Sequence, residues 1–166
     1  MNYCPQCATP LGDVLIDGEI RKGCGEQSCG YIHFNNPTPV VAMIVEVDGG
    51  VVMAHNVNWP KKFYSIITGF LEAGEDPLEC AKRETLEELN LHAVETSLIG
   101  VYGFAQQNQV IIAYHVRGAG EIKLNEELDD YKIVPVEELK GWGMGTGLAI
   151  NEWVEARLGR PPEQAF

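Results

Sequence analysis

Three glutamates with helical spacing follow a glycine-started loop in residues 69–91. At 100° per residue, Glu84, Glu87 and Glu88 fall within about 100° of one another on a helical wheel. Hard divalent cations such as Mg²⁺ prefer oxygen ligands and commonly bridge to substrate phosphates. The spacing therefore predicts a ridge of carboxylates that can support metal-assisted attack on a diphosphate.

The helix that positions these glutamates has recognisable ends. Asp76 suits the N-cap, Pro77 suits the first helical position, and Glu79 has the spacing of a capping box. The helix is expected to run to about Leu89. Asn90 is then expected to end it, because asparagine tolerates the left-handed conformation that follows many helices.

The glutamate ridge is not easily explained as a solvated surface. Like charges at i,i+3 and i,i+4 repel each other by roughly 0.2–0.5 kcal/mol per pair. No lysine lies among the glutamates, and Arg83 is expected to adjoin them rather than to face them. A bound cation would account for an arrangement that local rules disfavour.

Residues 69–91 resemble the signature box of the Nudix hydrolases, Gly-x5-Glu-x7-Arg-Glu-U-x-Glu-Glu-x-Gly-U, in which U is apolar. The chain matches this box at its first glycine, at every charged position and at the last apolar position: Gly69, Glu75, Arg83, Glu84, Glu87, Glu88 and Leu91. Two positions depart mildly from it. Thr85 replaces an aliphatic residue, and Asn90 replaces the final glycine.

The resemblance implies an α/β fold, a Nudix-type helix–sheet–helix sandwich with a mixed β-sheet. It implies hydrolysis of a nucleoside diphosphate derivative with Mg²⁺ or Mn²⁺, which would neutralise phosphate charge and lower the pKa of a bound water. Glu84, Glu87 and Glu88 would hold the catalytic metal. Arg83 would orient a neighbouring carboxylate, and Glu75 would brace the loop; the general base stays unassigned.

Another metal ligand is expected, by the same resemblance, after the box. The acidic segment 125–130 resembles the segment that supplies it, with Glu127 as first choice and Glu126 as second. A solvated acidic turn is an equally good interpretation. Substrate-binding residues stay unassigned, because the aromatic residues that can stack on a base are more typical of a core: Trp59, Phe63, Tyr102 and Phe104.

Two pairs of cysteines flank a short segment that can form a hairpin: Cys4, Cys7, Cys24 and Cys29. Such pairs suit a tetrahedral Zn²⁺ site, although the second pair has four intervening residues instead of two. Disulfides are disfavoured without a secretion signal, and a thioredoxin-like redox role lacks its βαβ pattern. Residues 1–36 are therefore predicted to form a structural zinc ribbon, and residues 37–166 the Nudix hydrolase domain.

The remaining chain predicts the strands and the second helix of an α/β body. Strands are expected over residues 39–47, 51–55, 98–104, 110–116 and 132–136. A last helix is expected from about Thr146 to Leu158, with Gly159 ending it.

Length and charge limit the classes of protein to which the chain can belong. Its 166 residues leave room for one moderate domain and a small appendage. The net charge of −12 argues against broad adhesion to nucleic acid or to an anionic membrane. No apolar run has the length of a membrane span, and the first residues show no signal pattern, so a cytoplasmic protein is expected.

A zinc ribbon before a Nudix box resembles the NADH pyrophosphatase group, some of whose members remove NAD caps from RNA. That group has a Ser-Gln-Pro-Trp-type motif after the box, where this chain has Val-Tyr-Gly-Phe-Ala-Gln-Gln-Asn-Gln-Val at 101–110. The missing motif weakens the assignment of NADH as the substrate. The expected substrate is a small nucleoside diphosphate derivative, with ADP-ribose, FAD or another dinucleotide-like diphosphate open beside NADH. A capped RNA end is the one nucleic-acid partner that the resemblance implies, and homodimers are frequent in the family.

Two other classes of function compete with the hydrolase. One is a catalytically inactive Nudix-fold ligand sensor, which the intact carboxylates disfavour. The other is a zinc-ribbon regulator that binds nucleic acid. Residues 1–36 hold two basic residues against four acidic ones, and so offer no basic stripe for such binding.

Overall fold

The computed structural model describes residues 1–165, and the chain divides into two compact units, Met1–Asn36 and Pro37–Phe166. The first unit is a three-stranded antiparallel sheet of β1 (Leu11–Ile16), β2 (Glu19–Cys24) and β3 (Ile32–His33). Asp17 and Gly18 join β1 to β2 with positive φ angles of 53° and 85°. Two successive residues with positive φ are typical of a tight hairpin turn, so the hairpin predicted between the cysteine pairs is present.

The second unit is built on a six-stranded mixed sheet. Its order is β7-β8-β4-β5-β9, and β6 also pairs with β4. Strands β4 and β8 are parallel, whereas the other pairs are antiparallel. The six strands are β4 (Thr38–Val47), β5 (Gly50–Asn56), β6 (Ile67–Phe70), β7 (His92–Phe104), β8 (Gln109–Ala119) and β9 (Leu128–Val134).

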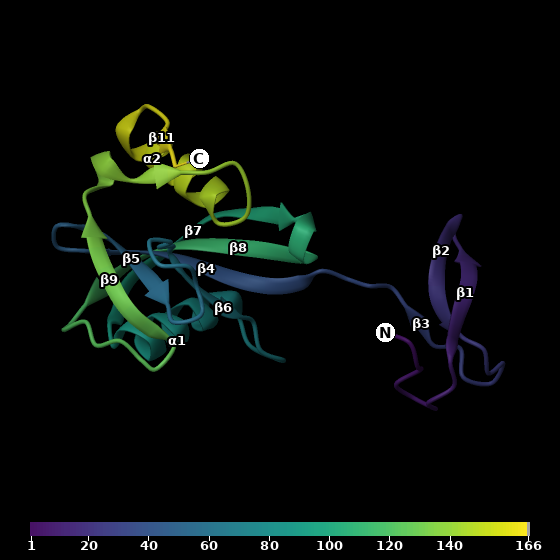
Figure 1. Cartoon of the computed structure of the whole chain (residues 1–166). Coiled ribbons are helices and arrows are strands. Elements are labelled where there is room, and N and C mark those ends of the chain that lie inside the picture. Colours follow the sequence, from purple (N-terminus) through teal and green to yellow (C-terminus); the bar gives the residue numbers. More distant parts are fainter. Residues whose placement is uncertain (166) are drawn as a thin grey trace. The chain divides into compact units, whose positions relative to one another are not determined.

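Helices α1 (Pro77–Leu89) and α2 (Gly147–Leu158) cover opposite faces of this sheet (Figure 1). Alternate residues of β4 supply the two cores: Val41 and Met43 pack on the α1 side, and Ala42 and Ile44 on the α2 side. The unit is thus a helix–sheet–helix sandwich with a mixed sheet, as predicted. Within residues 1–165, no helix is both long enough and apolar enough to cross a membrane.

Short elements complete the second unit. β10 (Lys140–Gly141) and β11 (Glu163–Gln164) form a small parallel pair. Two 3₁₀ turns, η1 (Ala105–Gln107) and η2 (Val136–Glu138), follow β7 and β9.

The ends of α1 are set by the residues that the sequence indicated. The Asp76 carboxylate accepts a hydrogen bond from the Leu78 backbone N–H at 2.8 Å, and Asn90 ends the helix in the left-handed region with φ 59°. The capping-box prediction for Glu79 is wrong in its detail. Its carboxylate instead accepts from Lys82 one turn along, at 2.7 Å.

Strands β7 and β9 begin earlier than their sequences predicted. β7 starts at residue 92 and contains two bulges, which interrupt the alternation that identifies a strand. β9 starts at Leu128, inside the segment interpreted as an acidic turn. Asp129 and Asp130 have low β propensity, but their side chains bond to His55 and Tyr64 and so the strand tolerates them.

Candidate active site

Strand β6 and helix α1 come together at Gly69, which pairs with Val41 of β4. A Cβ atom on Gly69 would lie only 2.1 Å from the carboxyl carbon of Glu84 and 2.1 Å from its Oε1. Glycine therefore leaves the space in which the Glu84 carboxylate rests against the strand. The side chain of Glu84 is only 13% exposed.

Arg83 connects three carboxylates of the box. Its Nε and Nη2 donate to Glu75 at 2.7 and 2.9 Å, while Nη1 donates to Glu84 at 2.7 Å and to Glu87 at 3.0 Å. The prediction that Arg83 would not face the carboxylates is therefore wrong. The i,i+4 spacing of Arg83 and Glu87 was the sequence signal for this contact. Arg83 relieves part of the repulsion that the sequence argument assigned to a cation.

Glu75 closes the loop between β6 and α1. One of its oxygens accepts from the Glu72 backbone N–H at 3.1 Å, in addition to the two bonds from Arg83. The bidentate contact with Arg83 lowers the pKa of Glu75 to about 2. Glu75 therefore stays charged and holds both the loop and the guanidinium.

Glu88 lies on the inner side of α1 and is 8% exposed. Burial first, and then the charges of Glu84 and Glu127, raise the pKa of Glu88 to about 8. Burial also raises the pKa of Glu84, although Arg83 opposes that shift. A buried carboxylate that meets other carboxylates is a position where a cation would bind favourably.

A cavity of about 330 Å³ brings Glu84, Glu88 and Glu127 together. Glu127 comes from the segment before β9, about 40 residues beyond the helix. The fold of the sheet, and not proximity in the sequence, therefore brings Glu127 close to Glu84 and Glu88. Glu87 and Glu126 do not line the cavity. The side chain of Glu87 is 54% exposed and is held by Arg83 at the edge of the ridge.

The donor set of this cavity fits a hard cation. All three acidic groups present carboxylate oxygens, the ligands that Mg²⁺ and Mn²⁺ prefer. The three carboxylates are not drawn into a compact cluster, however. Among the described residues, sets of three or more ligand atoms within 4.8 Å of one another occur at the four cysteines alone. Arg83 donates to Glu84 at 2.7 Å, and the charges of Glu84 and Glu127 act unfavourably on an ionised Glu88.

A second cavity of about 430 Å³ adjoins the first, and the two share Trp59, Thr68, Gly69 and Phe70. Aromatic side chains surround it: Trp59, Phe63, Phe70, Phe104 and Trp142. The rings of Trp59 and Phe63 meet edge to face, with centroids 5.1 Å apart. This aromatic cavity was not predicted as a site, although three of its residues had been noted for their ability to stack.

Tyr102 does not belong to the aromatic cavity, since its hydroxyl donates to Glu152 of α2 at 2.7 Å. Phe104 and Gln109 do line the cavity, and both lie in the segment 101–110. The segment that differs from the NADH pyrophosphatase motif is thus part of the aromatic wall.

In the first unit, the four cysteine sulfurs lie within 4.8 Å of one another. Cys4 and Cys29 are 3.6 Å apart at Sγ, and Cys7 and Cys24 are 3.4 Å apart. Four sulfurs bound tetrahedrally to zinc at 2.3 Å would be separated by about 3.8 Å. The backbone N–H groups of Gln6 and Glu26 point at Cys4 and Cys24 from 3.4 and 3.5 Å. The cluster fits zinc.

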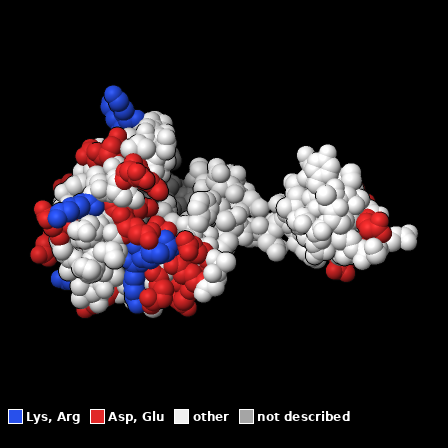
Figure 2. Space-filling model, turned by 90° about the horizontal axis from the view of Figure 1, so that it is seen from below, with Lys and Arg blue, Asp and Glu red and all other residues white. Residues whose placement is uncertain are grey.

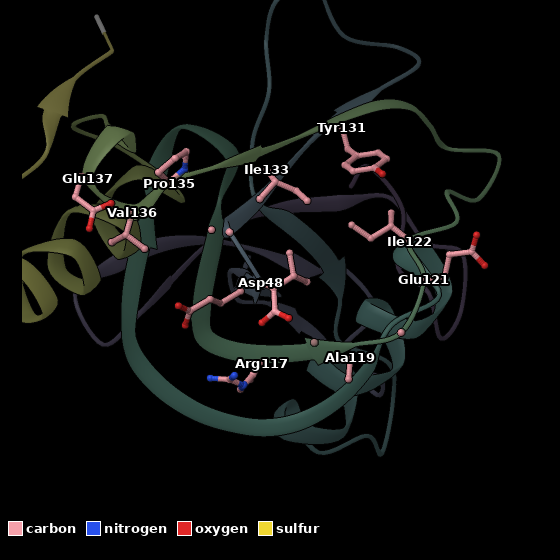
Figure 3. A pocket seen from close by; sticks show the side chains of 16 residues that line it. Asp48, Arg117, Ala119, Glu121, Ile122, Tyr131, Ile133, Pro135, Val136 and Glu137 are labelled. Atoms are coloured by element: carbon pink, nitrogen blue, oxygen red, sulfur yellow. The ribbon is translucent and has the colours of Figure 1, made fainter.

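A larger hollow, of about 900 Å³, lies elsewhere (Figure 3). Its wall mixes apolar side chains such as Tyr131 and Ile133 with Asp48 and Arg117, and none of the box carboxylates lines it. Volume alone therefore does not identify the site. Acidic side chains outnumber basic ones on the face shown in Figure 2, in keeping with the net charge of −12.

Comparison with known proteins agrees with this geometry. Residues 36–150 match the NUDIX domain. The NAD-capped RNA hydrolase NudC of Vibrio parahaemolyticus is 27% identical over 141 residues, which cover 84% of this chain and 53% of that protein. The protein of the same name from Stutzerimonas stutzeri is 24% identical over 164 residues, which cover 96% of this chain and 58% of that protein.

Solved structures show the same fold. A NUDIX hydrolase from Nitrosomonas europaea has a TM-score of 0.78 at 23% identity, covering 99% of this chain and 97% of that chain. The chain spans about half the length of the curated relatives that it matches. Because the NUDIX match covers most of its residues, the chain belongs to the Nudix family.

Proposed function

We propose that this protein is a metal-dependent hydrolase that cleaves the diphosphate linkage of a nucleoside diphosphate derivative. One observation carries the proposal. The cavity lined by Glu84, Glu88 and Glu127 adjoins an aromatic cavity, and Trp59 borders both. A nucleoside diphosphate has the matching two parts, an anionic diphosphate that needs a cation and a flat base that stacks on aromatic rings.

Each residue of the box has a role in this proposal. Glu84, Glu88 and Glu127 hold Mg²⁺ or Mn²⁺ in the cavity, and Glu87 contributes from the exposed edge of the ridge. Bound metal would neutralise phosphate charge and lower the pKa of the attacking water. Arg83 orients Glu84, and Glu75 fixes Arg83. Gly69 leaves the space that the Glu84 carboxylate needs.

The aromatic cavity is proposed to bind the base or the second ring of the substrate. The named activity of the relatives, hydrolysis of NAD-capped RNA, supports a dinucleotide-like substrate such as NADH or a capped RNA end. Because Phe104 and Gln109 stand in the segment that lacks the Ser-Gln-Pro-Trp-type motif, substrate preference is expected to differ from theirs. ADP-ribose and FAD are therefore equal candidates.

The cysteine cluster is proposed to bind one structural Zn²⁺ in a ribbon of residues 1–36. The sulfur separations and the two backbone N–H groups aimed at sulfur support this assignment. A cytoplasmic location and a homodimer stay predictions from the sequence.

The test is a substrate panel with Mg²⁺ or Mn²⁺. It contains NADH, ADP-ribose, FAD, diadenosine polyphosphates, nucleoside triphosphates and an NAD-capped RNA, and products are separated by chromatography. At least one member is expected to be split within its phosphate chain. Glu88→Gln and Glu87→Gln should each lower kcat. Glu79→Gln is the matched control, because Glu79 lies on the same helix and, among the described residues, forms its ion pair with Lys82.

Two outcomes would count against the hydrolase. Binding of panel members without turnover would favour the ligand sensor. Equal turnover by wild type and Glu88→Gln would remove the carboxylate cavity from the mechanism.

A further inference from the structure

His55 of β5 has a hydrogen-bond acceptor at each of its ring nitrogens. Nδ1 lies 2.5 Å from Oδ1 of Asp129, and Nε2 lies 3.3 Å from the backbone carbonyl of Pro60. A carboxylate and a carbonyl can only accept, so satisfying both requires a proton on each nitrogen. The ring is therefore an imidazolium when both bonds are formed. The bond to Asp129 raises the pKa of His55, which favours this state.

One of the two bonds holds the loop that carries Trp59. Pro60 follows Trp59 directly, and the Trp59 backbone N–H donates to the carbonyl of Asn56 at 2.9 Å. Trp59 borders the carboxylate cavity and the aromatic cavity. The bond from His55 Nε2 to Pro60 therefore fastens the wall that the two cavities share.

The other bond holds the segment that carries Glu127. Asp129 lies two residues after Glu127, at the point where the β5–β9 pairing shifts register between His55 and Asn56. Beyond this bulge, the Val57 backbone N–H donates to the Glu127 carbonyl at 2.9 Å. Because a bulge weakens a ladder locally, the side-chain bond from His55 to Asp129 stabilises the place where Glu127 leaves the sheet.

We propose that His55 is a positioning residue which sets Trp59 and Glu127 at the active site through two separate hydrogen bonds. The inference rests on the proposed function, because it assigns substrate contact to Trp59 and metal binding to Glu127. His55 itself lies in another hollow, lined also by Tyr64, Asp129 and Asp130, and is absent from the walls of both active-site cavities.

The other polar groups around His55 leave Asp129 as its partner. The Tyr64 hydroxyl donates to Asp130, and Lys132 lies over the Tyr64 ring at 3.7 Å from its centroid. The Tyr64 ring is itself 5.5 Å from the His55 ring. The remaining charged groups of this hollow are Lys61 and Lys62, for which the described residues show no ion pair. Asp130 therefore already accepts a hydrogen bond from Tyr64, and Asp129 is the carboxylate that accepts from the His55 imidazolium.

Two near-isosteric variants of the full-length protein separate the two bonds. His55→Asn places an amide near Nδ1 and keeps the contact with Asp129, whereas His55→Gln reaches toward Pro60. The measurements are the dissociation constant for Mn²⁺ alone, by calorimetric titration, and kcat and KM for the substrate that the panel identifies. His115→Asn and His115→Gln are matched controls, because His115 also contacts a carboxylate, Glu46 at 2.8 Å, but lines neither active-site cavity.

The expected result is opposite for the two variants. His55→Gln weakens Mn²⁺ binding by about five-fold with KM nearly unchanged, and His55→Asn raises KM by about five-fold with Mn²⁺ binding nearly unchanged, since each loses one hydrogen bond. Asp129→Ala, which removes the acceptor of the hydrogen bond from His55 Nδ1, should resemble His55→Gln. This third variant decides the matter if the His55 variants do not fold by circular dichroism.

Equal effects of both variants on both quantities, or equal effects of the His115 controls, would overturn the positioning role. The failure of this inference is distinguishable from failure of the proposed function. If Glu88→Gln abolishes Mn²⁺ binding and turnover while His55→Gln and Asp129→Ala match wild type, the inference alone fails. If Glu88→Gln also matches wild type, the proposed function fails with it.

Discussion

The carboxylate of Glu84 occupies the space that a side chain at Gly69 would need. A Cβ atom there would lie 2.1 Å from Oε1 of Glu84, closer than any non-bonded contact allows. The φ of Gly69 is not in the positive range, so the glycine is required for space and not for backbone conformation. The absence of a side chain at Gly69 thus lets Glu84 of helix α1 pack directly against strand β6.

Gly69→Ala should therefore reduce activity more than stability. Its methyl group would displace the Glu84 carboxylate, and a displacement of about 1 Å at a reacting centre can lower kcat by about 100-fold. Steady-state kinetics and thermal unfolding measure the two effects. Gly12→Ala is the control, because nothing lies within 4 Å of the added Cβ at that strand glycine. Unchanged kcat in Gly69→Ala would show that Glu84 does not need its observed place.

Glu75→Gln should destabilise the protein at neutral pH, and the difference from wild type should shrink in acid. Because Arg83 lowers the pKa of Glu75 to about 2, the bond contributes stability above the unfolded value of about 4.5 and loses it as the pH falls toward 2. Urea unfolding at pH 6 and pH 3 measures this change. Glu79→Gln should alter stability little at either pH, and a pH-independent loss in Glu75→Gln would contradict the ion pair.

In the metal-free protein, the ionisation of Glu88 should lower the free energy of unfolding as the pH rises from about 4.5 to about 8. The folded-state pKa of about 8 lies above the unfolded value, so the folded protein binds the extra proton in this window. The slope from this group reaches at most about 1.4 kcal/mol per pH unit. Glu88→Gln should remove it, and unfolding measured in chelator from pH 5 to pH 8 tests both proteins.

Mn²⁺ should reverse the effect of pH on the wild type. Binding requires the ionised carboxylate, so the rise in unfolding temperature on adding Mn²⁺ should be larger at pH 8 than at pH 6. Glu88→Gln should show a smaller rise at both values. An identical rise in unfolding temperature in wild type and variant would show that Glu88 does not bind the metal.

Removal of zinc should unfold residues 1–36 and leave the second unit folded. Both main cores consist of residues from Val41 onward, so the second unit does not depend on the cysteines for its packing. Metal analysis should find about one zinc per chain, and Cys29→Ser should lower it. Hydrogen exchange should then rise in the β1–β2 hairpin and stay slow in β4. Equal protection of the hairpin with and without zinc would contradict a structural metal.

Local sequence patterns correctly predicted the features that depend only on a residue and its near neighbours along the chain. Asp76 and Asn90 end α1 as expected, because capping depends on bonds within one helical turn. The hairpin between the cysteine pairs follows from the turn residues Asp17 and Gly18 in the same way. The contact of Arg83 with Glu75 was not foreseen, since the guanidinium reaches from α1 to a carboxylate in the preceding loop.

The order of residues thus determined the box, the ends of its helix, the cysteine pairs and the class of fold. Tertiary structure alone decided that Glu127 meets Glu84 and Glu88, and that Trp59 stands between the two cavities. It also decided that His55 reaches both Asp129 and Pro60. The contacts of Glu127 and Asp129 depend on the pairing of β5 with β9, and strand pairing joins segments far apart in the chain whose spacing leaves no local periodic signal.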